Sequence, residues 1–179
     1  MTRSDLEHLI RAAGAIAQDS QIVVVGSQAV LGQFPEAPHA LLASMQAGVF
    51  PRHRPERADL IEGAIGEGSS FHEQFGYYAQ GVSEQTATLP AGWKERLVTV
   101  MNQNTGGIEG LCLEVHDLAL SKYVAGREKD LAFCALLARH ALTRRQTLLQ
   151  RAAQTKLSQP LRKLVEGRIR RDFPSKDGR

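Results

Sequence analysis

A buried strand that ends in a Gly-Ser turn constrains the fold of this chain more than any other stretch. Residues 22–25 read IVVV, and an unbroken β-branched run is typical of a strand buried on both faces. Gly26 and Ser27 end this strand, because glycine permits a tight turn and serine can cap a short helix over residues 28–33. The backbone amides of Gly26, Ser27 and Gln28 would then form a phosphate-binding geometry at the start of that helix.

A second strand is predicted over residues 43–50. Its apolar side chains recur at every second position, so one face is apolar and the opposite face is directed at the Gly-Ser turn. The apolar positions are Met45, Ala47 and Val49, and the opposite positions are Ser44, Gln46 and Gly48.

This order of elements resembles the polymerase-beta-like nucleotidyltransferase superfamily. It is most similar to the small bacterial members related to abortive-infection nucleotidyltransferase toxins, some of which act in toxin–antitoxin pairs. Residues 61–82 and 113–133 carry further likeness, and the resemblance extends over about residues 21–142. It implies transfer of a nucleoside monophosphate from a nucleoside triphosphate to a hydroxyl of RNA, protein or a small molecule, with magnesium as cofactor.

One departure from the family pattern changes this expectation. The second strand of the family carries two acidic residues, one apart, that bind two magnesium ions, whereas this chain has Gln46 and Gly48 there. Magnesium is a hard cation that is held by carboxylate and phosphate oxygens. A glutamine amide and a glycine cannot form a two-metal clamp. We therefore expect an impaired or inactive protein, a pseudoenzyme in which magnesium binding is doubtful.

The fold class expected is α/β (α+β): a small mixed, mostly antiparallel sheet flanked by helices, followed by a helical part. The domains predicted are residues 1–115 and 116–179. Further strands are expected over residues 77–82, 86–89, 96–101 and 111–115, and an N-terminal helix with a capping box formed by Ser4 and Glu7.

Three other positions in the sheet domain are candidates for chemistry. Arg52 follows the second strand in an Arg-His-Arg turn and could bind phosphate, or the turn is merely solvated. His72 with Glu73 could act in acid–base chemistry, although adjacent residues do not share a helix face. The family places a third carboxylate on a later strand, and the sequence does not choose among Glu84, Glu95 and Glu109.

The helical part contains a second group of candidates. The resemblance implies that Lys122 and Asp130 flank the nucleotide, with Arg127 and Lys129 nearby. Lys122 would supply a point charge for phosphate, and Asp130 would position it or polarise a hydroxyl. The alternative is a salt bridge that joins helices. Helical spacing predicts an inward face on residues 127–142, made of Leu131, Ala135, Ala138 and Leu142.

Composition limits the remaining possibilities. The chain has 179 residues, 42% of them hydrophobic, which is enough for a packed core. Its two cysteines have no metal-binding spacing, so a reducing cytoplasm is the expected setting. No apolar run approaches the length of a membrane span, and the N-terminus has no signal-peptide core.

The C-terminal segment from Lys156 onwards is basic, with eight Lys/Arg against three acids. Such a segment can bind RNA phosphates, form a solvated face or meet an acidic protein partner. Two functions therefore stand beside each other: an impaired nucleotidyltransferase, or a non-catalytic nucleotide- or RNA-binding regulatory module.

Overall fold

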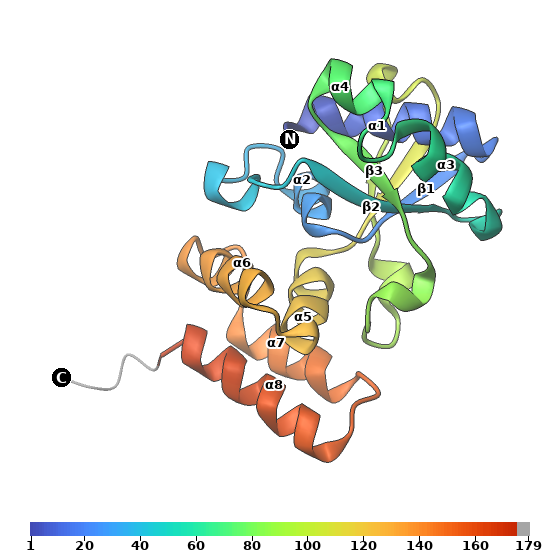
Figure 1. The fold of residues 1–179 in the computed structure, drawn as a ribbon. Coiled ribbons are helices and arrows are strands. Elements are labelled where there is room, and N and C mark those ends of the chain that lie inside the picture. The colour runs from blue at the N-terminus through green and yellow to red at the C-terminus, as the bar shows by residue number, and fades with distance from the viewer. Residues whose placement is uncertain (175–179) are drawn as a thin grey trace. The chain divides into compact units, whose positions relative to one another are not determined.

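The computed structural model describes residues 1–174, and this part of the chain forms two compact units (Figure 1). Unit 1 comprises Met1–Thr86 and Lys94–Glu114, and it contains the whole sheet. Unit 2 comprises Ala87–Trp93 and, from Val115 onwards, the helices of the remaining described chain. No helix in residues 1–174 is long and apolar enough to cross a membrane.

Unit 1 is built on a five-stranded mixed sheet with the order β3-β2-β1-β5-β4. The pairs β1–β5 and β2–β3 are parallel, whereas β1–β2 and β4–β5 are antiparallel. The predicted mixed α+β class is confirmed, but the expectation of a mostly antiparallel sheet is wrong. The strands are β1 (Gln21–Val24), β2 (Gln46–Pro51), β3 (Tyr78–Gly81), β4 (Val98–Val100) and β5 (Glu109–Cys112).

Two helices cover one face of this sheet at close range. A Cβ atom on Gly110 of β5 would lie 2.4 Å from Ile10, and one on Gly81 of β3 would lie 2.2 Å from the carbonyl oxygen of Ala58. Gly110 leaves room for the Ile10 side chain of α1, and Gly81 lets the α3 backbone approach β3. The helices of unit 1 are α1 (Arg3–Ala17), α2 (Val30–Gln33), α3 (Ala58–Ile65) and α4 (Ser70–Phe75).

Several local predictions for unit 1 are wrong. The capping box of α1 is formed by Thr2 and Asp5, not by Ser4 and Glu7. Residues 86–89 form no strand, because a short 3-10 turn over Glu84–Thr86 replaces it. Met45 precedes β2 and is 53% exposed, so it is not part of the apolar face.

Unit 2 packs four helices together in the described chain. They are α5 (Val115–Ala125), α6 (Glu128–Arg139), α7 (Arg145–Ala153) and α8 (Gln159–Asp172). The buried face of α6 is formed by Asp130, Phe133, Cys134 and Leu137, not by the face predicted from leucine and alanine spacing. Ser158 caps α8, because its side chain accepts a hydrogen bond from the Leu161 amide.

The Gly-Ser turn of unit 1 depends on a close approach of two backbones. The amide of Val25 donates to the carbonyl oxygen of Gly48 at 3.0 Å. A Cβ atom on Gly26 would lie 3.0 Å from the Gly48 nitrogen. Since the φ of Gly26 is −80°, any residue could adopt its backbone conformation. Glycine is therefore needed here for the approach of β2, not for the turn angle. Ser27 makes no side-chain capping hydrogen bond, so that predicted cap is wrong.

Gly26→Ala should lower the free energy of unfolding by about 1–3 kcal/mol, because the added methyl group meets backbone atoms that cannot move aside alone. Gly48→Ala is the matched control, since a Cβ atom there has no neighbour nearer than 3.6 Å. Its stability should change by less than about 1 kcal/mol. Urea unfolding of both variants measures the difference, and equal destabilisation would contradict this role for Gly26.

Candidate functional site

The structure places most of the predicted site residues of unit 1 at one end of the sheet. The C-terminal end of β1 and the N-terminal ends of β2 and β3 meet there, because β1 runs antiparallel to β2 and β2 runs parallel to β3. The backbones of Gly26 and Gly48 are in contact. This agrees with the side-chain alternation predicted for β2, which directs Gly48 at the Gly-Ser turn. The described geometry thus brings Gly26, Ser27, Gln28, Gln46 and Gly48 together.

A chain of amide and hydroxyl hydrogen bonds crosses this end of the sheet. Gln28, which is fully buried, donates from Nε2 to the carbonyl oxygen of Ser44 at 3.0 Å. The Gln46 amide nitrogen donates to Ser44 Oγ at 3.1 Å. Gln46 Nε2 in turn donates to Oε1 of Gln80 on β3. Sequence reasoning missed Gln80, because it lies opposite Gly48 only through the parallel register of β2 and β3.

His72 lies near this end, but it supports the local fold. Its ring packs against Tyr78 with centroids 4.6 Å apart, and Tyr78 pairs in register with Gln46. Its Nδ1 accepts a hydrogen bond from the Gly68 amide at 3.1 Å, and its own amide donates to Ser69 Oγ. These contacts stabilise the start of α4. They give His72 a structural role, and acid–base chemistry by His72 with Glu73 stays a prediction.

Arg52 lies at the opposite end of the sheet, so it does not join the other candidates. Its amide donates to the carbonyl oxygen of Gln21, the first residue of β1. The turn that follows is held by buried Asp19, which accepts hydrogen bonds from the amides of His53 and Arg54 and from the His53 ring. β2 therefore carries Arg52 away from the Gly-Ser turn, and phosphate binding by Arg52 stays a prediction.

Unit 2 holds the second group around one buried carboxylate. Asp130 on α6 is 2% exposed, and its Oδ1 lies 3.2 Å from Nζ of Lys122 on α5. Arg127, which precedes α6, donates to both carboxylate oxygens of Asp130, at 2.6 and 3.2 Å. Arg127 itself remains 60% exposed. The contacts of Asp130 join α5 to α6, and the same contacts also hold the charged groups of Lys122 and Arg127 in place.

The pKa of Asp130 shows which interaction dominates. Burial alone would raise this pKa, but the hydrogen bond from Arg127 and the charge of Lys122 outweigh burial and lower it below 3.8. The hydrogen bond to Asp130 also raises the pKa of Arg127. The carboxylate is therefore ionised at neutral pH, and it serves as a fixed anion rather than as a proton carrier.

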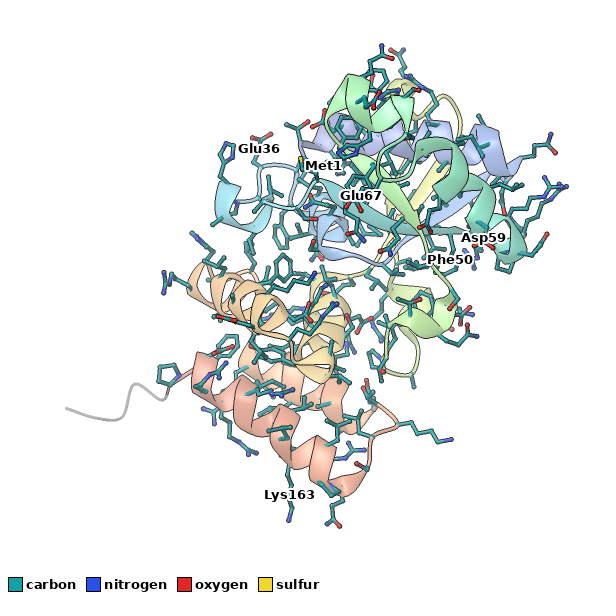
Figure 2. The ribbon with its side chains drawn as sticks, viewed as in Figure 1. Met1, Glu36, Phe50, Asp59, Glu67 and Lys163 are labelled. Atoms are coloured by element: carbon teal, nitrogen blue, oxygen red, sulfur yellow. The ribbon has the colours of Figure 1, made fainter. Side chains whose placement is uncertain are left out.

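The basic C-terminal helix uses its arginines within unit 2. Arg162 donates to carbonyl oxygens of Ala152 and Thr155, and Arg168 donates to that of Tyr123 at 2.6 Å. These contacts stabilise the C-terminal ends of α7 and α5. Lys163 points away from the helix into solvent (Figure 2). Lys176 and Arg179, also counted in the basic segment, lie outside the described residues.

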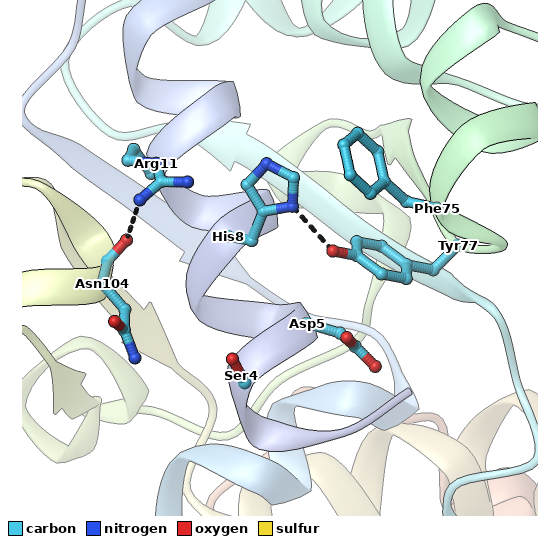
Figure 3. A pocket seen from close by; sticks show the side chains of 7 residues that line it. All are labelled: Ser4, Asp5, His8, Arg11, Phe75, Tyr77 and Asn104. Carbon is cyan, nitrogen blue, oxygen red and sulfur yellow. Dashed lines mark hydrogen bonds between the residues drawn. The ribbon is translucent and has the colours of Figure 1, made fainter.

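A cavity of about 450 Å³ lies elsewhere in unit 1, among α1, α4 and the segment around Asn104 (Figure 3). His8 Nδ1 and the Tyr77 hydroxyl are hydrogen bonded there at 2.7 Å. Burial lowers the pKa of His8. The cavity contains none of the residues predicted for phosphate or metal binding. It is lined by Ser4, Asp5, His8, Arg11, Phe75, Tyr77 and Asn104.

A comparison with known families decides the identity of the chain. A family model described as "Nucleotidyltransferase of unknown function (DUF6036)" matches residues 4–135, well over half of the sequence. The chain belongs to this nucleotidyltransferase family. Searches of curated proteins and of solved structures give no match.

The match defines which parts of this nucleotidyltransferase carry the family likeness. It includes the sheet, α5 and the first part of α6, and hence both groups of candidate residues. Helices α7 and α8 lie outside it, together with the basic segment. A nucleotide is accordingly the substrate class that family membership gives for this protein.

The residues present do not fit the paired magnesium ions expected for such a site. Gln46 already bonds to Gln80, and Gly48 has no side chain. Glu84 pairs with Lys94 at 2.8 Å, and Glu109 pairs with Gln21 at the far end of the sheet. Glu95 is exposed in a 3-10 turn.

Among residues 1–174, the acidic residue that follows a strand at the Gly-Ser end is Glu114, two residues beyond β5. Sequence reasoning did not single it out. One carboxylate is a poor magnesium site, since water competes for the ion. Within residues 1–174, no cluster of three or more His, Cys, Asp or Glu side chains could hold a metal.

Asp130→Asn should destabilise the nucleotidyltransferase by about 1–3 kcal/mol at neutral pH, because it removes a charged hydrogen-bond acceptor from Lys122 and Arg127. The pKa of Asp130 is lower in the folded protein than its value of 3.8 in the unfolded chain. The ionised carboxylate therefore stabilises the fold above pH 3.8, and this stability is lost as the pH falls through the pKa of the folded state. The difference between wild type and Asp130→Asn should therefore shrink below about pH 4.

Glu128→Gln is the matched control for this measurement, since Glu128 is an exposed acid in the same first turn of α6. It should change stability by less than about 0.5 kcal/mol at any pH. Urea unfolding at several pH values compares the three proteins. A deficit of Asp130→Asn that stays constant into acid would contradict the proposed ionic role.

Proposed function

We propose that this nucleotidyltransferase binds a nucleoside triphosphate and transfers its nucleotide very slowly or not at all. The observation that carries the proposal is the composition of β2 at the Gly-Ser end of the sheet. The two alternate positions of β2 there are Gln46, which bonds to a neighbouring glutamine, and Gly48, whose backbone meets Gly26. Neither supplies an anionic oxygen for a metal ion.

The physical argument concerns the transfer step. Phosphoryl-type transfer is catalysed mainly by positioning the reactants and by neutralising charge that develops on the phosphate oxygens. Metal ions held by carboxylates supply much of that neutralisation. A site that replaces both carboxylates keeps the means to bind a nucleotide but loses the group that lowers the barrier.

Unit 2 supports nucleotide binding by its own residues. Asp130 fixes Arg127 and Lys122 by charged hydrogen bonds, so that less side-chain entropy is lost when either cation meets a phosphate. Arg127 is the better candidate for direct contact, since it is 60% exposed and presents a planar guanidinium group. In this proposal Asp130 is a positioning residue.

The relation to abortive-infection toxins and a regulatory role as a pseudoenzyme are part of the same proposal. A protein that holds a nucleotide without consuming it can sequester a substrate or regulate an active relative. RNA binding receives less support, because Arg162 and Arg168 of the basic helix are engaged with carbonyl groups of unit 2.

The direct test combines binding and transfer. Thermal shift with ATP, GTP, CTP and UTP should show stabilisation by at least one nucleotide. Incubation with labelled nucleoside triphosphates, magnesium and total RNA or protein should give little or no incorporation. Strong incorporation would contradict the assignment of the metal positions, and no response to any nucleotide would contradict the binding proposal.

Restoring both carboxylates should create a metal-dependent protein. The double variant Gln46→Glu/Gly48→Asp places two carboxylates on one strand face, where they repel each other until a divalent ion binds. The Gly48 position admits the change, since a Cβ atom there makes only ordinary van der Waals contacts from 3.6 Å outwards. Millimolar magnesium or manganese should raise the Tm of the double variant relative to EDTA.

The wild type and each single variant are the controls for this restoration. They should show a much smaller metal-dependent shift, because one carboxylate holds magnesium poorly. A double variant whose melting curve is the same in EDTA and in metal would mean that these two positions do not form a metal site.

A further inference from the structure

We infer that the Gln46–Gln80 end of the sheet binds the phosphate groups of a nucleoside triphosphate directly as the metal-free anion, and that magnesium weakens this binding. The inference rests on the proposed function, because it takes a nucleotide as the ligand. It adds the form in which the nucleotide is bound and the residues that contact it.

The paired glutamines retain free donors. A glutamine amide carries two N–H donors, and only one N–H of Gln46 is used in the bond to Gln80. One N–H of Gln46 and both of Gln80 remain, and the pair lies in an exposed position. Phosphate oxygens only accept hydrogen bonds, and bonds from N–H to an anion are about twice as strong as neutral ones.

Strands β2 and β3 themselves carry no acidic side chain at this end, although burial and the charge of Glu67 raise the pKa of Tyr78. The side chains of β2 and β3 at this end are Gln46, Tyr78 and Gln80, beside Gly48 and the buried Gln28. A strand with two carboxylates would repel a triphosphate unless a metal ion lay between them. Here the anion meets neutral amide donors, so no metal ion is needed to bring it close.

Magnesium should oppose such binding for a simple reason. The ion takes the same phosphate oxygens that the amides would contact, and it gives up its bound waters reluctantly. In a site with paired carboxylates this disadvantage is offset, because the carboxylates and the phosphate oxygens coordinate the same ion. The Gln46–Gln80 pair has no anionic oxygen that could coordinate the magnesium ion. The magnesium complex of the nucleotide should therefore bind more weakly than the free anion.

The experiment is calorimetric titration of the full chain with ATP and with inorganic tripolyphosphate, in EDTA or in millimolar magnesium. Sodium chloride keeps the ionic strength equal, so that general charge screening does not contribute. The Kd of both probes should be about tenfold higher in magnesium. A common response of the two probes would support binding through phosphate.

A matched pair of variants assigns the effect to the amides. Gln80→Ala should raise the metal-free Kd by about tenfold to a hundredfold, the size expected for a lost hydrogen bond to a charged group. Gln103→Ala should leave Kd unchanged, since Gln103 is exposed in a 3-10 turn beyond β4, at the opposite end of the sheet.

The outcomes separate this inference from the proposed function. Tighter binding of ATP in magnesium would overturn the inference and leave nucleotide binding in place. Gln80→Ala with wild-type affinity would overturn the assignment to the glutamine pair. Failure of both probes to bind under either condition would overturn the inference and the proposed function together.

Discussion

The approach of the β2 backbone to Gly26 is the constraint on which the Gly-Ser end of the sheet depends. The Val25–Gly48 hydrogen bond continues the β1–β2 ladder past the end of β1, and the missing side chain of Gly26 lets the Gly48 backbone lie against it. This contact fixes the start of β2, and the parallel register then sets Gln46 beside Tyr78 and Gly48 beside Gln80. The hydrogen-bonded chain of Gln28, Ser44, Gln46 and Gln80 follows from that register.

Unit 2 is organised around a charge instead of a backbone contact. Asp130 is buried on the inner face of α6, and a carboxylate is rarely buried without partners. Lys122 and Arg127 supply them from α5 and from the turn before α6. Breaking a buried pair costs much more than its formation contributes, because the remaining charge is left without a partner. The cluster therefore holds two cations in place whether or not a nucleotide is bound.

The sequence was sufficient for features that depend on local chemistry. The β-branched run before Gly26 predicted β1, and the alternation in β2 placed Gly48 against the turn. Where two local patterns competed, the prediction failed. Thr2 with Asp5 and Ser4 with Glu7 have the same capping spacing, and only the structure shows that Glu7 is bound by Arg3 and two asparagines instead.

Features that depend on distant parts of the chain were not predictable. Gln80 lies at the site because β3 pairs with β2, a strand far from it in the sequence. Arg52 lies away from the site because β2 runs from one end of the sheet to the other. The buried face of α6 was predicted on the wrong side of the helix, because it contains the charged residue Asp130. A pattern of apolar residues gives no sign of a buried carboxylate that is paired with cations. The fold class was expected mainly from the family resemblance, the position of Gly48 against the turn came from local strand patterns, and the contacts between glutamines depend on register.

The central claim is that the Gly-Ser end of this sheet takes no divalent metal, in contrast to the two-carboxylate pattern that the sequence resembles. Its most direct test is a manganese titration of the isotopically labelled protein followed by NMR, because a bound paramagnetic ion broadens the signals of nearby nuclei. The account predicts that the backbone amides of Gly26 and Gly48 and the side-chain amides of Gln46 and Gln80 keep their line widths in the nucleotide-free protein. Selective broadening of these signals at low manganese concentration would contradict it.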